Sequence, residues 1–283
     1  MSSQPTASIV IPTSGRPDYL RVTLASVAPQ AQAHGAEVLV VNDGGDRATG
    51  AVAAGYGARV VDLAAPGGPN AGRNAGVRAA RSELIVLLDD DVDVPAGWLA
   101  AMLEGVAGSP EREVFGGPIR ARLEGGGPRS CGREPAPITT LDHGPSDRDV
   151  ELLWSANMAI RRPALDRVGE FDEALRGRGE EEDWERRYTA LGGAIRYLAK
   201  AGLDHRRSVA DSTLTSLARS AYGHGRAARR YDLRKGEPPS VAAELRTLAG
   251  CCWHVIRRRC ANGIVMAAQA AGRLRETLAG GSR

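Results

Sequence analysis

The stretch Leu84-Ile85-Val86-Leu87-Leu88-Asp89-Asp90-Asp91 decides how the rest of this sequence is interpreted. Five consecutive apolar residues are typical of a β-strand that is covered on both faces, as in a parallel sheet. Three aspartates follow it, and burying unpartnered carboxylates costs a large amount of free energy. A divalent cation is the natural partner, because Mg²⁺ binds one or two carboxylates together with substrate phosphates. A solvated acidic turn is the alternative, and the apolar strand directly before the aspartates weighs against it.

Short apolar runs alternate with helical patterns on both sides of this stretch, which predicts a parallel sheet with crossover helices. Strands are expected at residues 8–11, 37–41, 59–63, 84–88, 154–160 and 194–198, and helices at 18–27, 70–81, 95–106 and 180–191. Pro95 is expected in the first turn of its helix, where a missing N–H costs nothing. Glycine and proline dominate residues 116–149, which indicates an irregular region that faces the substrate. Beyond Ser208 the pattern is helical only.

Length and charge indicate one catalytic domain with an appendage. The chain has 283 residues, of which 42% are hydrophobic and 25% charged, as in an ordinary soluble globular protein. We expect a catalytic domain at residues 1–209 and a helical extension at 210–283. The extension has 13 Lys and Arg against 5 Asp and Glu, so the remainder of the chain is net negative. An acidic catalytic part suits metal binding, and a basic extension suits an anionic partner such as a membrane surface.

The four cysteines form neither a Cys-x-x-Cys pair nor a zinc-ligand spacing with a histidine; they are Cys131, Cys251, Cys252 and Cys260. A reduced compartment is the simpler interpretation. The N-terminus carries no basic segment followed by a cleavable apolar stretch, and no run reaches the roughly 18 apolar residues that cross a bilayer. The expected location is therefore cytoplasmic, with association to the inner face of the membrane left open.

Acidic turns follow two of the expected strands. Asp43 comes after the second strand and Asp89–Asp91 after the fourth. Ligands of an open parallel sheet gather at the carboxyl ends of its strands, so both turns are expected to face one crevice. The first strand is followed by Pro12-Thr13-Ser14-Gly15 and not by spaced glycines that open a helix, which excludes a dinucleotide fingerprint, and no Walker lysine is present.

Several short segments occur in a recognisable order. They are Val10-Ile11-Pro12-Thr13, Asp43, Asn70-Ala71-Gly72-Arg73-Asn74-Ala75-Gly76, Leu88-Asp89-Asp90-Asp91, Arg161-Arg162, Gly169-Glu170-Phe171-Asp172-Glu173 and Glu181-Glu182-Asp183-Trp184-Glu185. Each segment alone is a weak signal, but the ordered set, over roughly residues 7–205, resembles the inverting family 2 glycosyltransferases of the GT-A fold. The resemblance implies an α/β fold with a Rossmann-like, mostly parallel central sheet flanked by helices, here with a C-terminal helical tail. It also implies transfer of a hexose-type sugar from a nucleoside diphosphate sugar to an acceptor hydroxyl or other nucleophile.

The resemblance assigns the donor site. Its donor-binding residues are Pro12, Thr13, Asp43, Arg73, Asp89 and Asp90, and its metal ligands are Asp91, Asp89 and His205, with Mn²⁺ or Mg²⁺ as the cofactor. Asp43 would accept hydrogen bonds from the base or ribose, and Arg73 would place a fixed positive charge near the phosphates. A turn carboxylate and surface arginine or histidine are the alternatives. Many relatives have an aromatic residue where this chain has Ser14-Gly15, so the donor can be a UDP-, dTDP- or GDP-sugar.

The resemblance also assigns the base and the acceptor pocket. Inversion needs a carboxylate, opposite the leaving diphosphate, that takes the proton of the acceptor. In the family this carboxylate is the aspartate of a Glu-Asp pair, which matches Asp183, with Glu182 as the second choice. Acidic residues that merely favour the helix dipole are the alternative. Trp154 and Asn157 resemble residues that line the acceptor pocket, although Trp154 can equally fill core space.

The C-terminal extension combines apolar patches with arginines at Leu248–Ile256, Arg257–Arg259 and Ile264–Ala271. An amphipathic helical pair of this kind can lie on an anionic membrane, pack against the catalytic domain, or join two subunits of a homodimer. We expect no nucleic acid partner. The rival functions are a nucleotidyltransferase, whose glycine-rich loop after the first strand is missing, and a catalytically silent membrane-binding or scaffold protein. The sequence has no motif that identifies the acceptor.

Overall fold

The computed structural model describes residues 4–134 and 136–280, and the chain divides into two compact units. Unit 1 comprises residues 1–120, 141–174 and 180–205, and unit 2 comprises residues 121–140, 175–179 and 206–283. The domain boundaries expected from the sequence, 1–209 and 210–283, stay predictions. Residues 1–3, 135 and 281–283 of those ranges lie outside the described residues.

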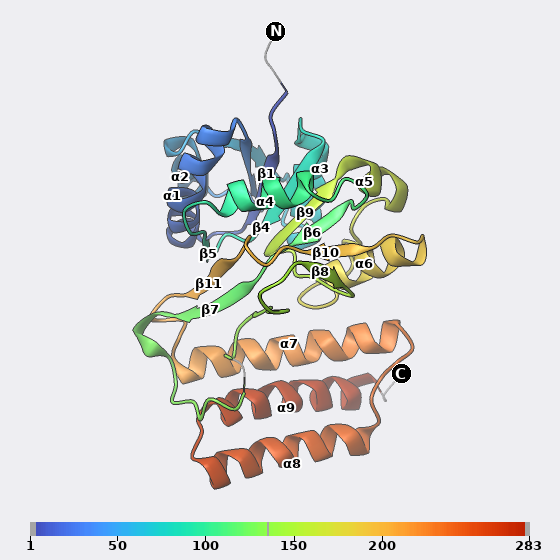
Figure 1. Cartoon of the computed structure of the whole chain (residues 1–283). Coiled ribbons are helices and arrows are strands. Elements are labelled where there is room, and N and C mark those ends of the chain that lie inside the picture. The colour runs from blue at the N-terminus through green and yellow to red at the C-terminus, as the bar shows by residue number, and fades with distance from the viewer. Residues whose placement is uncertain (1–3, 135, 281–283) are drawn as a thin grey trace. The chain divides into compact units, whose positions relative to one another are not determined.

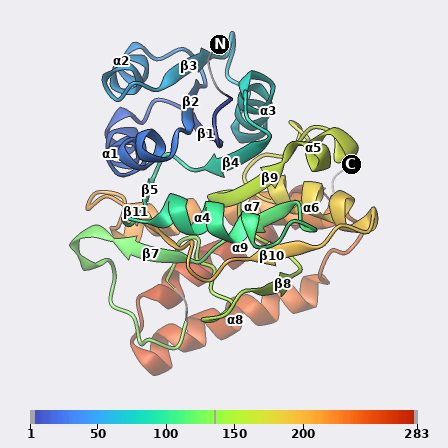
Figure 2. The ribbon, with the colours of Figure 1, turned by 45° about the horizontal axis from the view of Figure 1, so that its top comes forward.

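Unit 1 is built on an eight-stranded sheet with the strand order β3-β2-β1-β4-β9-β6-β10-β8 (Figures 1 and 2). The strands are β1 (Ser8–Thr13), β2 (Glu37–Asn42), β3 (Arg59–Asp62), β4 (Leu84–Leu88), β6 (Val114–Gly116), β8 (Arg148–Val150), β9 (Asn157–Arg161) and β10 (Ile195–Tyr197). All pair in one direction except β9 and β8, which run antiparallel to their neighbours. The predicted α/β fold with a mostly parallel central sheet is therefore confirmed.

Helices cover both faces of the sheet, and β1 shows how the sequence achieves this. The helices of unit 1 are α1 (Pro17–His34), α2 (Arg47–Gly55), α3 (Pro69–Ala79), α4 (Trp98–Ala107), α5 (Arg162–Val168) and α6 (Glu180–Ala190). Along β1, Ile9 and Ile11 pack into the core that contains α1, whereas Val10 packs into the core that contains α3. Successive side chains of a strand point to opposite faces, so an unbroken apolar run fills both cores.

Glycines bring α3 unusually close to β1. A Cβ at Gly76 would lie 2.1 Å from Val10 Cγ1, and a Cβ at Gly72 would lie 2.8 Å from Pro12 Cβ. Neither position tolerates a side chain without movement of β1 or α3. The glycines of the Asn70–Gly76 segment therefore seat the helix on the strand, and Arg73, between them, lies beside the end of the sheet.

A smaller sheet has the strand order β5-β11-β7, formed by β5 (Val92–Asp93), β11 (Leu203–Arg207) and β7 (Ile119–Leu123). Strand β11 runs antiparallel to β5 and pairs His205 with Val92. His205 comes after the last strand expected from the sequence, at residues 194–198, and β11 itself was not predicted. This pairing places His205 beside Val92, the residue that directly follows Asp91.

Unit 2 contains three long helices, α7 (Leu214–Arg234), α8 (Val241–Arg258) and α9 (Asn262–Gly280), and a 3₁₀ turn at Glu124–Gly126. Helix α9 packs against both α7 and α8 (Figure 1). Arg273 of α9 donates to Asp232 of α7 at 2.6 Å and to Glu244 of α8 at 2.7 Å. One guanidinium thus joins the three helices. Among residues 4–134 and 136–280, no helix combines the length and apolar character that a bilayer crossing requires.

Local expectations differ from the structure at several places. Pro95 lies before α4 and not in its first turn, because the chain turns at Gly97, whose φ is 84°, and the helix begins at Trp98. The expected strand at 154–160 begins only at Asn157. The stretch 116–149, expected to be irregular, contains β7 and the start of β8, and α2 and α5 were not predicted.

Candidate active site

The ends of three parallel strands meet at one edge of the large sheet. The N–H of Asp43, after β2, donates to the carbonyl of Thr13, at the end of β1, at 2.8 Å. Thr13 Oγ1 donates to the carboxylate of Asp90, after β4, at 2.5 Å. The end of β1 therefore connects the two acidic turns, although 46 residues separate Asp43 from Asp89 in the sequence.

Asp89, Asp91 and His205 form a cluster at this edge. One ligand atom from each lies within 4.8 Å of the others. His205 Nε2 is 3.2 Å from Asp91 Oδ1 and 4.0 Å from Asp89 Oδ2. His205 and Asp91 are buried, whereas the Asp89 side chain is 35% exposed and opens the cluster to solvent.

The donor set suits a divalent cation. Carboxylate oxygens are preferred ligands of Mg²⁺ and Mn²⁺, and an imidazole nitrogen is compatible with transition metals such as Mn²⁺. His205 Nδ1 is buried without a hydrogen-bond partner, whereas Nε2 faces the two carboxylates. Nε2, the nitrogen that faces the carboxylates, is the candidate ligand atom. The residues present therefore fit Mn²⁺ or Mg²⁺.

Arg16 is a member of the site that the sequence analysis missed. Its guanidinium forms ion pairs with Asp90 and, at 3.1 Å, with Asp91. Asp90 is only 1% exposed, and burial raises the pKa of its carboxyl to about 6 although the Arg16 charge opposes that shift. The predicted donor contact of Asp90 is untested; the structure surrounds this carboxylate with Thr13 and Arg16. The sequence signal that could have indicated Arg16 as a site residue was its position three residues after Thr13, a predicted donor-binding residue.

Asp43 holds the entrance to α3. Its carboxylate accepts the N–H of Gly67 at 2.7 Å and the N–H of Gly68 at 2.9 Å. An ionised carboxylate accepts about four hydrogen bonds, so two directions remain for a ligand. Asp43 is 9% exposed.

Arg73 is a fixed positive charge between α3 and the segment before β9. It is 6% exposed, and it donates to Asn70 Oδ1 and to Ser155 Oγ, both at 2.7 Å. A guanidinium held by two hydrogen bonds keeps its charge in place without a carboxylate partner. Trp154, adjacent to Ser155, is half-buried and packs on the core.

Asn157 has a different environment from the one expected of an acceptor-binding residue. It is 1% exposed, its Nδ2 donates to the carbonyls of Pro118 and Ala201, and its Oδ1 accepts from Trp98 Nε1. These bonds use both amide hydrogens. The side chain joins β9 to its neighbouring segments inside the core, and it offers no amide hydrogen to a sugar.

The acidic residues of α6 point to different partners. Asp183 accepts from Arg187 Nε at 3.0 Å, and Arg187 also donates to the carbonyls of Val168 and Glu170. Glu182 is 3.4 Å from Arg186. These pairs connect Asp183 and Glu182 to arginines of their own helix.

Glu181, which was not predicted as a site residue, interacts electrostatically with two residues of the site. Burial raises the pKa of its carboxyl, Arg73 lowers it, and Glu180 and Asp89 raise it further. The charges of Arg73 and Asp89 therefore both act on this carboxylate, which relates it to the fixed arginine and to the metal cluster. Glu181 directly precedes the predicted Glu182-Asp183 pair, so the sequence left open which residue of the acidic run 180–183 acts as the base.

Comparisons with known proteins identify the family. The sequence profile described as "Glycosyl transferase family 2" matches residues 8–169. The "Pre-mycofactocin glycosyltransferase" of two Mycobacterium tuberculosis strains, CDC 1551 / Oshkosh and H37Rv, is 30% identical over 232 residues. The match covers 78% of this chain but 46% of the relative, so the chain spans about half the length of these relatives.

Two solved structures share the fold. S. aureus TarS matches 78% of this chain and 39% of its own, with a TM-score of 0.52 and 21% identity. The "Mannosyltransferase PcManGT from Pyrobaculum calidifontis in complex with GDP-Man and Mn2+" matches 100% of this chain and 77% of its own, with a TM-score of 0.58 and 16% identity. Likenesses at these identities show a common fold, and the profile, which matches more than half of the chain, shows the family. The chain belongs to glycosyl transferase family 2.

Proposed function

We propose that this protein transfers a sugar, with inversion at the anomeric carbon, from a nucleoside diphosphate sugar to an acceptor hydroxyl. The observation that carries the proposal is the cluster of Asp89, Asp91 and His205 at the carboxyl end of β4. In sheets of this type ligands bind beyond the carboxyl ends of the strands. A site with carboxylates, an imidazole and a nearby buried arginine suits a diphosphate better than an uncharged ligand.

We infer that Asp91, His205 and Asp89 hold Mn²⁺ or Mg²⁺. Such an ion stabilises the charge that develops on the leaving diphosphate without a proton transfer. Asp90 has a separate role in this proposal: Thr13 and Arg16 hold it, and it in turn fixes the backbone that presents Asp89 and Asp91. Arg16 balances the negative charge of the aspartates.

The remaining donor contacts follow from the positions of Asp43 and Arg73. Asp43 keeps two acceptor directions after it binds Gly67 and Gly68, and these suit the N–H or O–H groups of a base or ribose. Arg73, fixed by Asn70 and Ser155, stabilises negative charge on the diphosphate.

We propose Glu181 as the carboxylate that accepts the proton of the acceptor hydroxyl. It interacts with Arg73 and Asp89, whereas Asp183, the residue expected from the sequence, pairs with Arg187. Glu181 is partly exposed, so an acceptor can reach it, and a glutamate with a raised pKa is a better base, since the ideal catalytic pKa lies near the operating pH. The predicted alternatives Asp183 and Glu182 remain the comparison for its test.

The decisive experiment measures release of the nucleoside diphosphate with Mn²⁺, with Mg²⁺ and with EDTA. Turnover should require the cation. Asp91→Asn should abolish turnover with either cation. Asp18→Asn, which changes an exposed aspartate at the start of α1, is the matched control and should behave as wild type. Equal turnover in EDTA and in Mn²⁺ would remove the cation from the proposal.

The donor and the acceptor are proposed only by class. One structural neighbour contains GDP-Man, so GDP-sugars join UDP- and dTDP-sugars as donors to be tested. The name of the sequence relatives suggests pre-mycofactocin as one acceptor to be tested, but these relatives are about twice as long as this chain. A panel of nucleotide sugars with Mn²⁺ in a thermal-shift assay selects the donor, because a bound ligand raises apparent stability by mass action.

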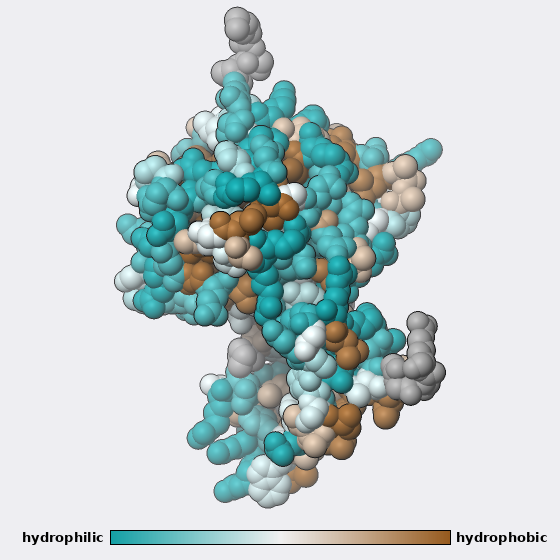
Figure 3. All heavy atoms as spheres, turned by 90° about the vertical axis from the view of Figure 1, so that its right-hand side faces the viewer, coloured by the Kyte–Doolittle hydropathy of each residue, from teal (hydrophilic) through white to brown (hydrophobic). Residues whose placement is uncertain are grey.

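We propose that α8 allows peripheral association with an anionic membrane. Hydrophobic residues lie at the surface of the part that holds α7–α9 (Figure 3). The exposed apolar residues of α8 include Leu245, Trp253 and Ile256, and exposed arginines follow at 257–259. A helix of this kind binds anionic lipid through both apolar burial and charge. We expect the protein to co-sediment with anionic vesicles and not with zwitterionic vesicles. A stable homodimer that binds neither kind of vesicle would contradict membrane association.

A further inference from the structure

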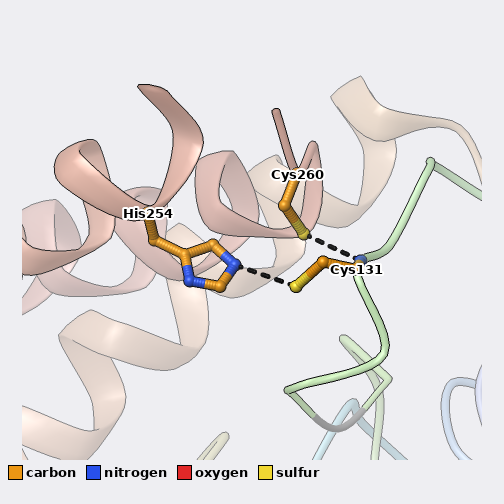
Figure 4. Close-up of side chains that lie close together, drawn as sticks. All are labelled: Cys131, His254 and Cys260. Carbon is orange, nitrogen blue, oxygen red and sulfur yellow. Dashed lines mark hydrogen bonds between the residues drawn. The ribbon is translucent and has the colours of Figure 1, made fainter. Parts of the chain in front are cut away.

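A second cluster of metal-ligating side chains lies in unit 2. Cys131, His254 and Cys260 each place one ligand atom within 4.8 Å of the others. Figure 4 shows the three side chains pointing toward one another from a loop, from α8 and from the turn between α8 and α9. All three belong to unit 2, and the proposed glycosyl transfer uses none of them.

The distances suit a tetrahedral ion. Cys131 Sγ is 3.4 Å from His254 Nε2. Zinc bonds of about 2.3 Å to sulfur and about 2.0 Å to nitrogen place the ligand atoms of a tetrahedron roughly 3.5–3.8 Å apart. The observed separation is close to one edge of such a tetrahedron. Small side-chain rotations therefore suffice to place all three atoms around one centre.

Hydrogen bonds of the backbone hold the loop against the junction of the helices. The N–H of Ala261 donates to the carbonyl of Arg129 at 2.9 Å, and the N–H of Cys131 donates to Cys260 Sγ at 3.3 Å. Metal thiolates commonly accept backbone N–H groups in this way, since outer-shell hydrogen bonds orient and tune the ligands. The loop is thus already aligned at the ligand atoms.

The turn that presents Cys260 is strained. Arg259 ends α8 with φ 49° and ψ 39°, and it is the one non-glycine residue with positive φ in the described part of the chain. A left-handed conformation is unfavourable for a residue with a Cβ, because the Cβ comes too close to the following carbonyl oxygen. Strained residues persist where surrounding contacts fix them, and the next residue, Cys260, is in contact with Cys131.

The electrostatic surroundings favour a metal-binding thiolate. Cys260 Sγ accepts the N–H of Cys131 at 3.3 Å, and an accepted hydrogen bond stabilises the thiolate form. The thiolate, and not the thiol, is the form that binds metals. Cys260 is buried, whereas Cys131 is exposed, so the cluster is reached from solvent on one side.

We propose that Cys131, Cys260 and His254 bind one Zn²⁺ ion that fastens the loop around Cys131 to the junction of α8 and α9. Two thiolates balance the charge of the ion, and both thiol protons pass to solvent on binding. Three protein ligands leave the fourth tetrahedral position for water on the exposed side. Soft sulfur ligands select Zn²⁺ here, whereas the oxygen-rich cluster of Asp89 and Asp91 suits Mg²⁺ or Mn²⁺, so the two sites take different ions.

The first test measures zinc in the full chain, purified under reducing conditions and without a metal-chelating column. We expect one equivalent of zinc in the wild type, and its loss in Cys131→Ser and in His254→Ala. Cys252→Ser is the matched control: it removes an exposed cysteine of the same helix, two residues before His254, and should retain the ion. Wild-type protein that stays below a tenth of an equivalent after incubation with Zn²⁺ and dialysis would refute the site.

Cobalt substitution separates the two metal sites. Tetrahedral Co²⁺ bound to cysteine gives an intense sulfur-to-metal charge-transfer absorption, which a site of aspartates and histidine does not give. We expect this band in the wild type and in Asp91→Asn, and its loss in Cys131→Ser. A spectrum without the band in the wild type would place Co²⁺ outside the cysteine cluster and overturn the proposal.

A third measurement needs no variant, so it holds even if the substitutions impair folding. Thiols of the native zinc-loaded protein are titrated with and without a chelator of Zn²⁺. We expect two additional reactive thiols after chelation, which peptide mass spectrometry assigns to Cys131 and Cys260. A disulfide between these two cysteines in reduced preparations, or equal reactivity in both conditions, would contradict metal binding. None of these readouts depends on glycosyltransferase activity.

Discussion

At the scale of single residues, the identity of the base is the most consequential question, and Glu181→Gln tests it. The substitution keeps the shape of the side chain and removes its capacity to accept a proton. Turnover should fall by at least ~10²-fold, the typical contribution of a general base, while donor affinity changes little. Release of the nucleoside diphosphate under saturating donor measures the first, and calorimetric titration with donor and Mn²⁺ measures the second.

Asp183→Asn is the control for that variant. It breaks the ion pair with Arg187, an i,i+4 interaction worth about 0.3–0.5 kcal/mol, so a small loss of stability and near-normal turnover are expected. If Asp183→Asn is inactive and Glu181→Gln is active, the base predicted from the sequence is correct.

The pH profile gives an independent signature of Glu181. Because its pKa is raised, the carboxylate becomes protonated, and the base is lost, at a pH above the ordinary range of glutamate. The acid limb of kcat/KM should therefore lie above that range in the wild type and disappear from the residual activity of Glu181→Gln. Saturating Mn²⁺ at every pH keeps competition between protons and the cation out of the profile. An acid limb at the same pH in both proteins would assign it to another group.

Glu185 offers a prediction about stability. It is 0% exposed, one carboxylate oxygen accepts the N–H of Leu153, and burial raises its pKa well above the usual value. The folded state therefore binds this proton more tightly than the unfolded state, so the free energy of unfolding falls as pH rises from the ordinary glutamate pKa to the raised one. Glu185→Gln keeps an acceptor for Leu153 and removes the charge.

The variant should melt higher than the wild type at neutral pH, by about 2–4 °C for each kcal/mol gained. The difference should vanish below the ordinary pKa of glutamate, where the wild-type side chain is neutral in both states. Thermal melts across this pH range measure both effects. A variant that melts lower than the wild type at neutral pH would mean that the ionised carboxylate has a partner that stabilises it.

At the scale of elements, the contact of α3 with β1 predicts opposite outcomes for two glycine substitutions. Gly76→Ala places a methyl group against Val10, a buried β-branched residue that cannot rotate away, and should cost about 1–3 kcal/mol. Gly50→Ala in α2 meets no atom within 4 Å and should stabilise by up to about 1 kcal/mol. Chemical denaturation measures both, and a neutral Gly76→Ala would mean that α3 can move away from the strand.

Elements also differ in how far the sequence predicted them. Leu84–Leu88 forms a strand with the predicted limits, because the charged residues on either side of this apolar run define where the buried strand begins and ends. Strand β11 was missed, because Leu203-Asp204-His205-Arg206-Arg207 contains one apolar residue and depends on pairing with β5. Because β11 was not predicted, there was no structural reason to expect His205 close to Asp91, although His205 itself was predicted as a metal ligand.

The candidate sites show the same dependence on distance along the chain. Asp43 and Asp89–Asp91 could be placed together from the sequence, since the ends of parallel strands share an edge. The cysteine cluster could not, because 123 residues separate Cys131 from His254 and no local spacing indicates their contact. The choice among Glu181, Glu182 and Asp183 depends on helix phase, which four consecutive acidic residues do not reveal.

At the scale of the whole molecule, each unit has its own core and its own proposed ion, which leads to a prediction for calorimetry. A ligand stabilises the structure that binds it by about 2.7 kcal/mol at one hundred times its dissociation constant. Donor with Mn²⁺ should therefore raise the melting temperature of unit 1, whereas removal of Zn²⁺ should lower that of unit 2. We expect two transitions that respond to different ions, read out by scanning calorimetry of the full chain.

Variants assign the two transitions. Asp91→Asn should remove the shift caused by donor and Mn²⁺ and leave the effect of zinc removal intact, and Cys131→Ser should do the reverse. Arg273 provides an internal marker for unit 2, since it joins α7, α8 and α9 through Asp232 and Glu244: Arg273→Met should lower the second transition alone. A single transition that both ions shift equally would mean that the two units unfold together, and binding would then have to be separated by the cobalt spectra and the thiol titration.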